Sequence, residues 1–279
     1  MTLYRDMDRA ALDAAYNNGV AVADSAAWIA RWEQRSAELR AAMPEHLDLR
    51  YGPAERERVD FFACAERNAP TLIFIHGGYW QNRAKETFGF VAEGPLARGI
   101  NVATIGYTLA PAARLDAIVA QCRTALHFVH RQLDRLGGDP QRLFVSGWSA
   151  GGHLTAMLMN ETIVAGGMAI SGLYDLEPIR LNYLNEKLGL DAEEAARNSP
   201  LFHVPRQAAP LVVAVGGGEL PELRRQSEAY FAAWQARQLP GELLVLPGRH
   251  HYSALEELAR PQGVLTQALA RRVFQSARQ

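Results

Sequence analysis

The sequence predicts an α/β protein whose mostly parallel, twisted sheet is covered by helices on both faces. Three observations support this prediction: short apolar segments recur along the chain, amphipathic segments with helical spacing lie between them, and glycine-rich turns follow several of them. Continuously apolar strands separated by helices are typical of parallel sheets, because the crossover helices bury both faces. With 279 residues, 48% of them hydrophobic, the chain is long enough for one large core.

Seven apolar segments are expected to form the strands of this sheet. They are residues 58–63, 71–75, 101–105, 142–146, 167–170, 211–215 and 242–246. Residues 115–136 give the clearest helix prediction, because apolar side chains recur there every three or four positions before Gly137 and Gly138 end the pattern. We expect residues 1–279 to form a single domain.

Two segments stand outside this alternation of strands and helices. Residues 1–45 precede the first strand and are expected to form a helical arm, in which Ser25 caps a helix that stops at Pro44. Residues 174–205 fall between two predicted strands and are expected to form a short lid insertion, with a plain surface helix as the alternative.

The composition argues against several kinds of partner. Lys and Arg number 29 against 30 Asp and Glu, with no long run of either sign, so neither nucleic acid nor a membrane surface is expected as a partner. The two cysteines, Cys64 and Cys122, match no metal spacing and are too few for a disulfide scaffold. The N-terminus lacks the apolar stretch of a signal peptide, so we expect a cytoplasmic protein. No bound metal is expected either. A homodimer is compatible with the sequence.

A G-x-S-x-G motif follows the predicted strand 142–146 and precedes a helical segment. Ser149 is at its centre, between Gly147 and Gly151. A strand that turns abruptly into a helix strains the backbone of the serine and leaves room only for hydrogen at the flanking positions. This context is that of the nucleophile elbow in the α/β-hydrolase fold, so we expect Ser149 to be a nucleophile.

A second glycine-rich turn follows the predicted strand 71–75. The backbone N–H groups of Gly77 and Gly78 are expected to form an oxyanion hole, with the N–H of Ala150 as a further donor. His76 begins this turn, and we expect it to hold the loop by a hydrogen bond rather than to carry a proton.

The general base and its acid partner are expected in later strand-to-helix turns. His251 is the preferred base and His250 its alternative, because both follow the last predicted strand. Glu219, after the strand 211–215, is the first candidate for the acid that orients the imidazole. Asp175 is its rival from the neighbouring strand end, while Glu222 suits a helix N-terminus.

Four aromatic side chains are expected to bind a planar substrate. Tyr79, Trp80, Trp148 and Tyr174 all lie next to predicted strand ends, where the ligands of such sheets bind. The alternative for each of them is packing in the core.

Together these motifs resemble kynurenine formamidases (arylformamidases) and the bacterial esterases related to them. The resemblance extends from about residue 70 to the C-terminus, and it rests on the segments HGGYW, GWSAGGH, SGLYDLEPI, RNSP, ELPELRRQS, HHY and VLTQ. It implies Ser149 as nucleophile, His251 as base, Glu219 at the acid position, and Gly77 and Gly78 in the oxyanion loop. Two positions depart from the family: it usually has Asp at position 219, and Trp148 is bulky for the residue before the nucleophile.

The resemblance implies hydrolysis of N-formylkynurenine to formate and kynurenine in tryptophan breakdown, without metal or organic cofactor. Two other functions remain open. A carboxylesterase, or a hydrolase of aryl carbamates and amides, would use the same residues on a small ester or amide. A binding protein that has lost catalysis would not need to retain both Ser149 and His251.

Overall fold

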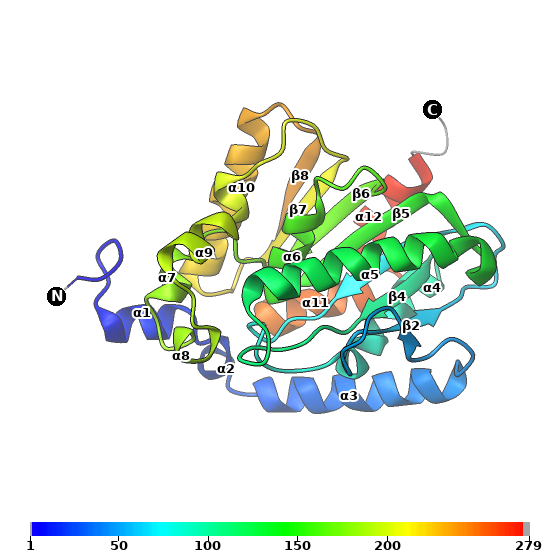
Figure 1. Cartoon of the computed structure of the whole chain (residues 1–279), viewed down its shortest axis with the longest axis horizontal. Coiled ribbons are helices and arrows are strands. Elements are labelled where there is room, and N and C mark those ends of the chain that lie inside the picture. The colour runs from blue at the N-terminus through cyan, green and yellow to red at the C-terminus, as the bar shows by residue number, and fades with distance from the viewer. Residues whose placement is uncertain (1, 276–279) are drawn as a thin grey trace.

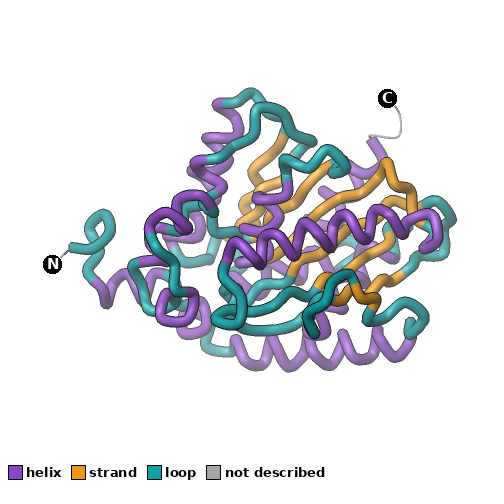
Figure 2. The backbone as a smooth tube through the Cα atoms, in the orientation of Figure 1, coloured by secondary structure: helices purple, strands orange, loops and turns teal. Residues whose placement is uncertain are grey.

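One eight-stranded sheet organises the chain. The computed structural model describes residues 2–275, so the ends of the expected domain, residue 1 and residues 276–279, lie outside the described residues. The strands run in the order β1-β2-β4-β3-β5-β6-β7-β8. They are β1 (Leu49–Arg50), β2 (Arg58–Phe62), β3 (Ala69–Ile75), β4 (Asn101–Ile105), β5 (Gly138–Trp148), β6 (Gly166–Ile170), β7 (Leu211–Gly216) and β8 (Gly241–Leu246). Figure 2 shows them as a continuous layer with helices around it.

The sheet is mostly parallel, as the sequence predicts. Only β1 and β2 run antiparallel to their neighbours, and the six strands from β4 to β8 in the sheet order pair in parallel. All seven predicted strands are confirmed. The two-residue strand β1 was not predicted, and β5 is longer at both ends than the apolar segment 142–146.

The chain also forms twelve α-helices and two short 3-10 helices within residues 2–275. They are α1 (Arg9–Ala15), α2 (Asn18–Ala21), α3 (Ser25–Ala42), η1 (Lys85–Ala92), α4 (Glu93–Leu96), α5 (Leu115–Leu136), α6 (Ala150–Leu158), α7 (Glu177–Arg180), α8 (Asn185–Leu188), α9 (Ala192–Arg197), η2 (Pro200–Phe202), α10 (Pro221–Ala236), α11 (His251–Ala259) and α12 (Val264–Gln275). None of the described helices is both long enough and apolar enough to cross a bilayer.

Alternate strand residues pack against opposite layers of helices. On one face, Ile73 and Val145 belong to a buried cluster with side chains of α5, α6 and α10. On the other face, Leu72 and Phe144 pack with side chains of α3, η1, α11 and α12. The period of two in the strands therefore produces the two-sided burial on which the prediction rests. Figure 1 shows α5 and α3 on different sides of the sheet.

The helix predictions are confirmed with one correction. Helix α5 covers Leu115–Leu136 and ends in Gly137, whose φ of 80° suits a residue without a Cβ. Helix α3 ends before Pro44 as expected, but its N-cap is Asp24. Ser25 is the first helical residue, and its hydroxyl donates a hydrogen bond to the carbonyl of Gly19 (3.0 Å), so it does not cap α3.

The arm and the segment 174–205 lie against each other. Residues 174–205 form α7, α8, α9 and η2 between β6 and β7. The backbone N–H of Tyr183 donates to the carboxylate of Asp13 in α1 (2.9 Å). Figure 1 shows α7 and α8 beside α1 and α2. Two parts of the chain that are far apart in sequence thus meet next to the carboxyl ends of the strands.

Candidate active site

Ser149 occupies the sharp turn between β5 and α6. Its backbone has φ 59° and ψ −119°, in the left-handed half of conformational space that L-residues avoid, and its N–H donates to the carbonyl of Ile170 (2.8 Å). A Cβ on Gly151 would collide with the carbonyl of Ile75 in β3. The glycine is required because the first turn of α6 lies directly against the sheet, and this packing holds Ser149 in its strained conformation.

His251 and Glu219 form a buried hydrogen-bonded pair. The Nδ1 atom of His251 lies 2.7 Å from Oε2 of Glu219. The other carboxylate oxygen, Oε1, accepts hydrogen bonds from the hydroxyl of Ser171 (2.5 Å) and the N–H of Gly216 (2.7 Å). Because a carboxylate only accepts, Nδ1 carries the proton, which leaves Nε2 of His251 with a free lone pair.

The other two acids considered from the sequence bind elsewhere. Asp175 accepts hydrogen bonds from the hydroxyl of Tyr4 (2.8 Å) and from the N–H of Glu177 (3.0 Å). Glu222 pairs with Arg225 and accepts from the hydroxyl of Tyr16 (3.0 Å). Among the candidate acids, Glu219 is therefore the one that the structure places on His251.

His250 has a local role at the start of α11. Its Nδ1 accepts the N–H of Ser253 (3.2 Å) and completes a capping box with the hydroxyl of that serine. Its ring packs edge-on against Trp28, with 5.4 Å between the centroids. Burial lowers the pKa of His250 below its ordinary value.

Trp148, the residue before Ser149, contacts His251 directly. The two rings are 4.5 Å apart, and the indole N–H donates to the backbone carbonyl of His251 (2.9 Å). Trp148 also lines the cavity described below. The bulky residue in the motif thus connects the turn of the serine to the turn of the histidine.

Gly77 and Gly78 begin the turn after β3. Gly78 has φ 111°, and a Cβ on Gly77 would lie 2.7 Å from the ring and the carbonyl of Trp148. Within residues 2–275, the N–H groups of these two glycines donate no hydrogen bond. Ala150 is the first residue of α6, where a backbone N–H has no partner inside the helix. These donors are free to bind a ligand oxygen.

His76 holds this turn from within the core. Its Nδ1 lies 2.7 Å from the carbonyl of Gly77, and its ring stacks on Tyr107 with 4.2 Å between the centroids. Burial lowers the pKa of His76 from 6.5 to about 4, so the side chain is neutral near pH 7.

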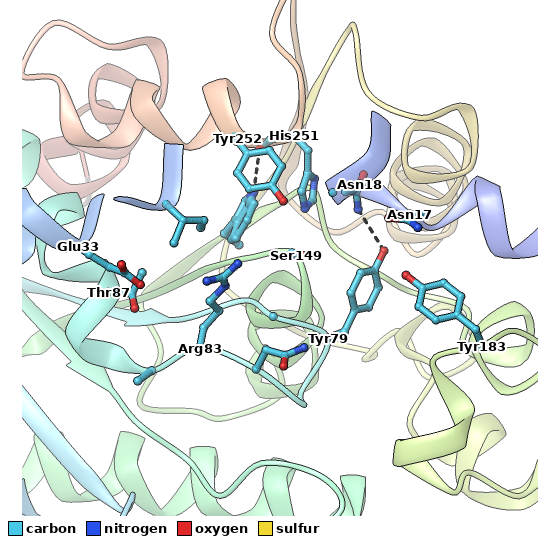
Figure 3. Close-up of a pocket in the computed structure, with 16 residues that line it drawn as sticks. Asn17, Asn18, Glu33, Tyr79, Arg83, Thr87, Ser149, Tyr183, His251 and Tyr252 are labelled. Carbon is cyan, nitrogen blue, oxygen red and sulfur yellow. Dashed lines mark hydrogen bonds between the residues drawn. The ribbon is translucent and has the colours of Figure 1, made fainter. Parts of the chain in front are cut away.

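Ser149 and His251 open onto a cavity of about 560 Å³, a size suited to a small organic molecule (Figure 3). The arm supplies much of its wall, with residues Asn17, Asn18, Gly19, Ile29 and Glu33. Among residues 174–205, only Tyr183 lines it. The Ser149 hydroxyl forms no hydrogen bond within the described part of the chain. Sequence reasoning missed the arm, since no local motif marks Asn17 to Glu33 as parts of a site.

Two of the four aromatics expected at the site lie elsewhere. Tyr79 and Trp148 line the cavity, but Trp80 and Tyr174 are fully buried away from it. The indole N–H of Trp80 donates to His153 (3.2 Å) in α6, and the ring of Tyr174 stacks on Tyr230 at 4.3 Å. For these two residues the alternative, core packing, is the correct one.

Within residues 2–275, no group of three or more His, Cys, Asp or Glu side chains is arranged to hold a metal ion.

Known proteins place the chain in a family. The model of the BD-FAE family matches residues 60–164, and that of the prolyl oligopeptidase family matches residues 121–268. The kynurenine formamidase of Danio rerio is 33% identical over 245 residues, and that of Salmo salar is 34% identical over 246; each match covers 82% of both chains. The chain belongs to the kynurenine formamidase family. The resemblance that the motifs indicate is thereby confirmed.

Solved structures agree with the fold. A candidate thioesterase from Silicibacter sp. TM1040 has a TM-score of 0.84 and 29% identity, covering 92% of this chain and 98% of its own. An esterase of Pyrobaculum calidifontis has a TM-score of 0.66 at 21% identity, with 88% and 92% covered, which supports the fold alone. The predicted α/β-hydrolase fold is confirmed, and this member of the kynurenine formamidase family is a hydrolase of the esterase and formamidase type.

Proposed function

We propose that the protein hydrolyses an aryl formamide such as N-formylkynurenine to formate and the free amine. The observation that supports this most is that Ser149 and His251 line one cavity and that Glu219 is hydrogen-bonded to His251, in a chain 33–34% identical to kynurenine formamidases. The catalytic residues in this proposal are Ser149, His251 and Glu219, and no metal or organic cofactor takes part.

His251 is the general base of the first step. Glu219 accepts a hydrogen bond from the Nδ1–H of His251, so the imidazole keeps its lone pair on Nε2, on the ring edge away from Glu219. This nitrogen removes the hydroxyl proton of Ser149 while the serine oxygen attacks the formyl carbon. The buried carboxylate of Glu219 stabilises the imidazolium that forms.

Backbone N–H groups hold the oxyanion of the tetrahedral intermediate. Gly77 and Gly78 donate from the turn after β3, and Ala150 donates from the N-terminus of α6, where the helix dipole also favours negative charge. Their preorganised geometry stabilises the transition state without reorganising solvent.

Collapse of the intermediate breaks the C–N bond. His251 returns its proton to the departing aryl amine, and the formyl group stays on Ser149 as an ester. Water, deprotonated by His251, then attacks this ester, and the serine oxygen leaves with the proton to release formate. An aryl amine is a less basic leaving group than an alkyl amine, so the machinery of an esterase suffices.

A carboxylesterase or an aryl carbamate hydrolase is the second candidate. The esterase structures that share this fold favour it, because the same residues would serve a small acyl ester. Steady-state hydrolysis of N-formylkynurenine and of p-nitrophenyl acetate by the wild type and Ser149→Ala separates the two. We expect efficient formamide turnover that the substitution abolishes. Negligible formamide turnover beside ester cleavage through Ser149 would transfer the assignment to the esterase.

The third possibility, a binding protein that has lost catalysis, is tested by labelling with a serine-directed fluorophosphonate. We expect the wild type to be labelled at Ser149 and the alanine variant to remain unlabelled. An unlabelled wild-type chain would remove the basis for a nucleophilic serine.

A further inference from the structure

Two opposite charges line the cavity without a partner. Arg83 and Glu33 are exposed, and both belong to the wall that includes Ser149. Within residues 2–275, neither side chain forms a hydrogen bond or an ion pair. Other charged side chains near the site are paired, such as Arg35 with Glu256. A ligand that carries a carboxylate and an ammonium group would complement both charges at once.

Arg83 stands on a fixed backbone beside the oxyanion turn. Its φ is 74°, and its carbonyl accepts a hydrogen bond from the guanidinium of Arg56. The preceding residue, Asn82, donates its N–H to the carbonyl of Gly78 (3.0 Å), so Arg83 follows directly from the turn of Gly78. An arginine held in this way loses little backbone freedom when its side chain binds a ligand.

The charged part of the Arg83 side chain reaches into the cavity. Figure 3 shows the guanidinium extending from the loop toward Ser149 and Tyr252. Burial raises the pKa of Tyr252, and the positive charge of Arg83 opposes that rise. A planar guanidinium in this position suits a carboxylate, which it binds through two parallel hydrogen bonds.

Glu33 supplies the complementary charge from the arm. It lies on α3, and Figure 3 places it beside Thr87, on the same side of the cavity as Arg83. Tyr79, Asn18 and Tyr183 lie on the other side of Ser149 in that view. The cavity therefore has a charged end and an end of aromatic and amide groups.

We infer that Arg83 and Glu33 select substrates with a zwitterionic amino-acid head group. Arg83 binds the carboxylate and Glu33 binds the ammonium group. The inference rests on the proposed function, because it assigns the side chain of an N-formylkynurenine-like substrate to the charged end of the same cavity.

Competitive inhibition tests the inference without requiring formamide turnover. The inhibitor probes are kynurenine, which has both charges, kynuramine, which lacks the carboxylate, and 3-benzoylpropionate, which lacks the ammonium group. Inhibition constants are measured against p-nitrophenyl acetate hydrolysis by the wild type, Arg83→Gln and Glu33→Gln. Each inhibition constant is determined from the ester hydrolysis of the same variant, so a change in that variant's uninhibited rate does not affect the constant.

Arg83→Gln should raise the inhibition constants of kynurenine and 3-benzoylpropionate by roughly 10- to 100-fold and leave that of kynuramine unchanged, as expected for loss of charge-assisted hydrogen bonds. Glu33→Gln should weaken kynurenine and kynuramine and spare 3-benzoylpropionate. The controls Arg67→Gln and Glu38→Gln remove the same charges from exposed positions outside the cavity, and they should change no inhibition constant.

Equal inhibition of the wild type and Arg83→Gln by kynurenine would overturn the inference, as would no inhibition of the wild type. A protein that binds kynurenine through Arg83 but does not cleave N-formylkynurenine would refute the proposed function and keep the inference. The two failures are thereby distinguished.

Discussion

Replacing Glu219 by Gln tests the acid of the proposed triad. The carboxylate has two distinct faces: Oε1 accepts from Ser171 and Gly216, and Oε2 faces Nδ1 of His251. The N–H of Gly216 is an obligate donor, so the glutamine oxygen must take the Oε1 place. Its NH₂ group then points at Nδ1 of His251.

This inversion disables the base without removing it. An NH₂ group donates, so Nδ1 must become the acceptor and the ring proton must move to Nε2. The nitrogen that should take the proton of Ser149 then has no lone pair free. The same change in the well-studied serine protease triad lowers kcat by about 10⁴. We expect a loss of about 10³ to 10⁴ here, or roughly 4 to 5.5 kcal/mol of transition-state stabilisation.

The assay is steady-state hydrolysis of N-formylkynurenine or p-nitrophenyl acetate, with thermal unfolding measured on the same samples. The fold should be retained, because both hydrogen bonds to Oε1 survive in the glutamine. Asp175→Asn is the matched control: it also neutralises a buried carboxylate after a strand, but that carboxylate contacts Tyr4 and the N–H of Glu177. We expect a rate change below about tenfold for the control, the size of one lost hydrogen bond.

A folded Glu219→Gln variant that keeps more than a tenth of the wild-type rate would rule out Glu219 as the acid of the triad. A larger loss in Asp175→Asn than in Glu219→Gln would place the acid after β6 rather than after β7 and so overturn the assignment.

Three further results are expected. Lowering the pH from 7 to 5 should reduce the free energy of unfolding, measured by urea denaturation, by about 2 kcal/mol for each of His76 and His153. Burial lowers the pKa of each histidine from 6.5 to about 4. Between these two values the unfolded chain therefore binds protons that the folded chain does not. Equal stability at the two pH values would contradict this. Trp148→Phe should lower the kcat of ester hydrolysis about tenfold, because it loses the indole hydrogen bond to the backbone carbonyl of His251. Tyr79→Phe should destabilise the chain by about 1 kcal/mol in thermal unfolding and speed proteolysis of the arm, because its hydroxyl donates to the arm backbone (2.6 Å); an unchanged cleavage rate would argue against this role.

The strands and the turn of Ser149 were predictable because local physics determines them. Apolar runs of four to six residues separated by helices are typical of buried strands, and the glycines around Ser149 follow from steric crowding in one turn. The order of strands along the chain also limits which loops meet at the carboxyl edge of the sheet. That is why Glu219 and His251 were the first candidates before their 2.7 Å contact was known.

Only two of the four aromatic residues expected at the site line the cavity, because proximity in sequence does not fix the direction of a side chain. Tyr79 and Trp80 are adjacent and both have positive φ, 49° and 59°. The turn sends Tyr79 to the cavity and Trp80 into the core, where its indole N–H meets His153. No pattern in HGGYW distinguishes the two, because the outcome depends on a polar partner in α6.

The arm was predicted as a helix but not as part of the site. Its contacts with the rest of the chain explain why the two rival acids, Asp175 and Glu222, do not bind His251. Asp175 accepts the hydroxyl of Tyr4 (2.8 Å), and Glu222 accepts the hydroxyl of Tyr16 (3.0 Å). Each acid lies near a strand end, as Glu219 does, yet each binds a tyrosine from the first sixteen residues. The acids at the carboxyl edge of the sheet therefore have two roles. Glu219 orients His251, and Asp175 and Glu222 hold the arm that forms part of the cavity wall. A sequence pattern that marks strand-end acids identifies both groups, and only the long-range tyrosine contacts separate them.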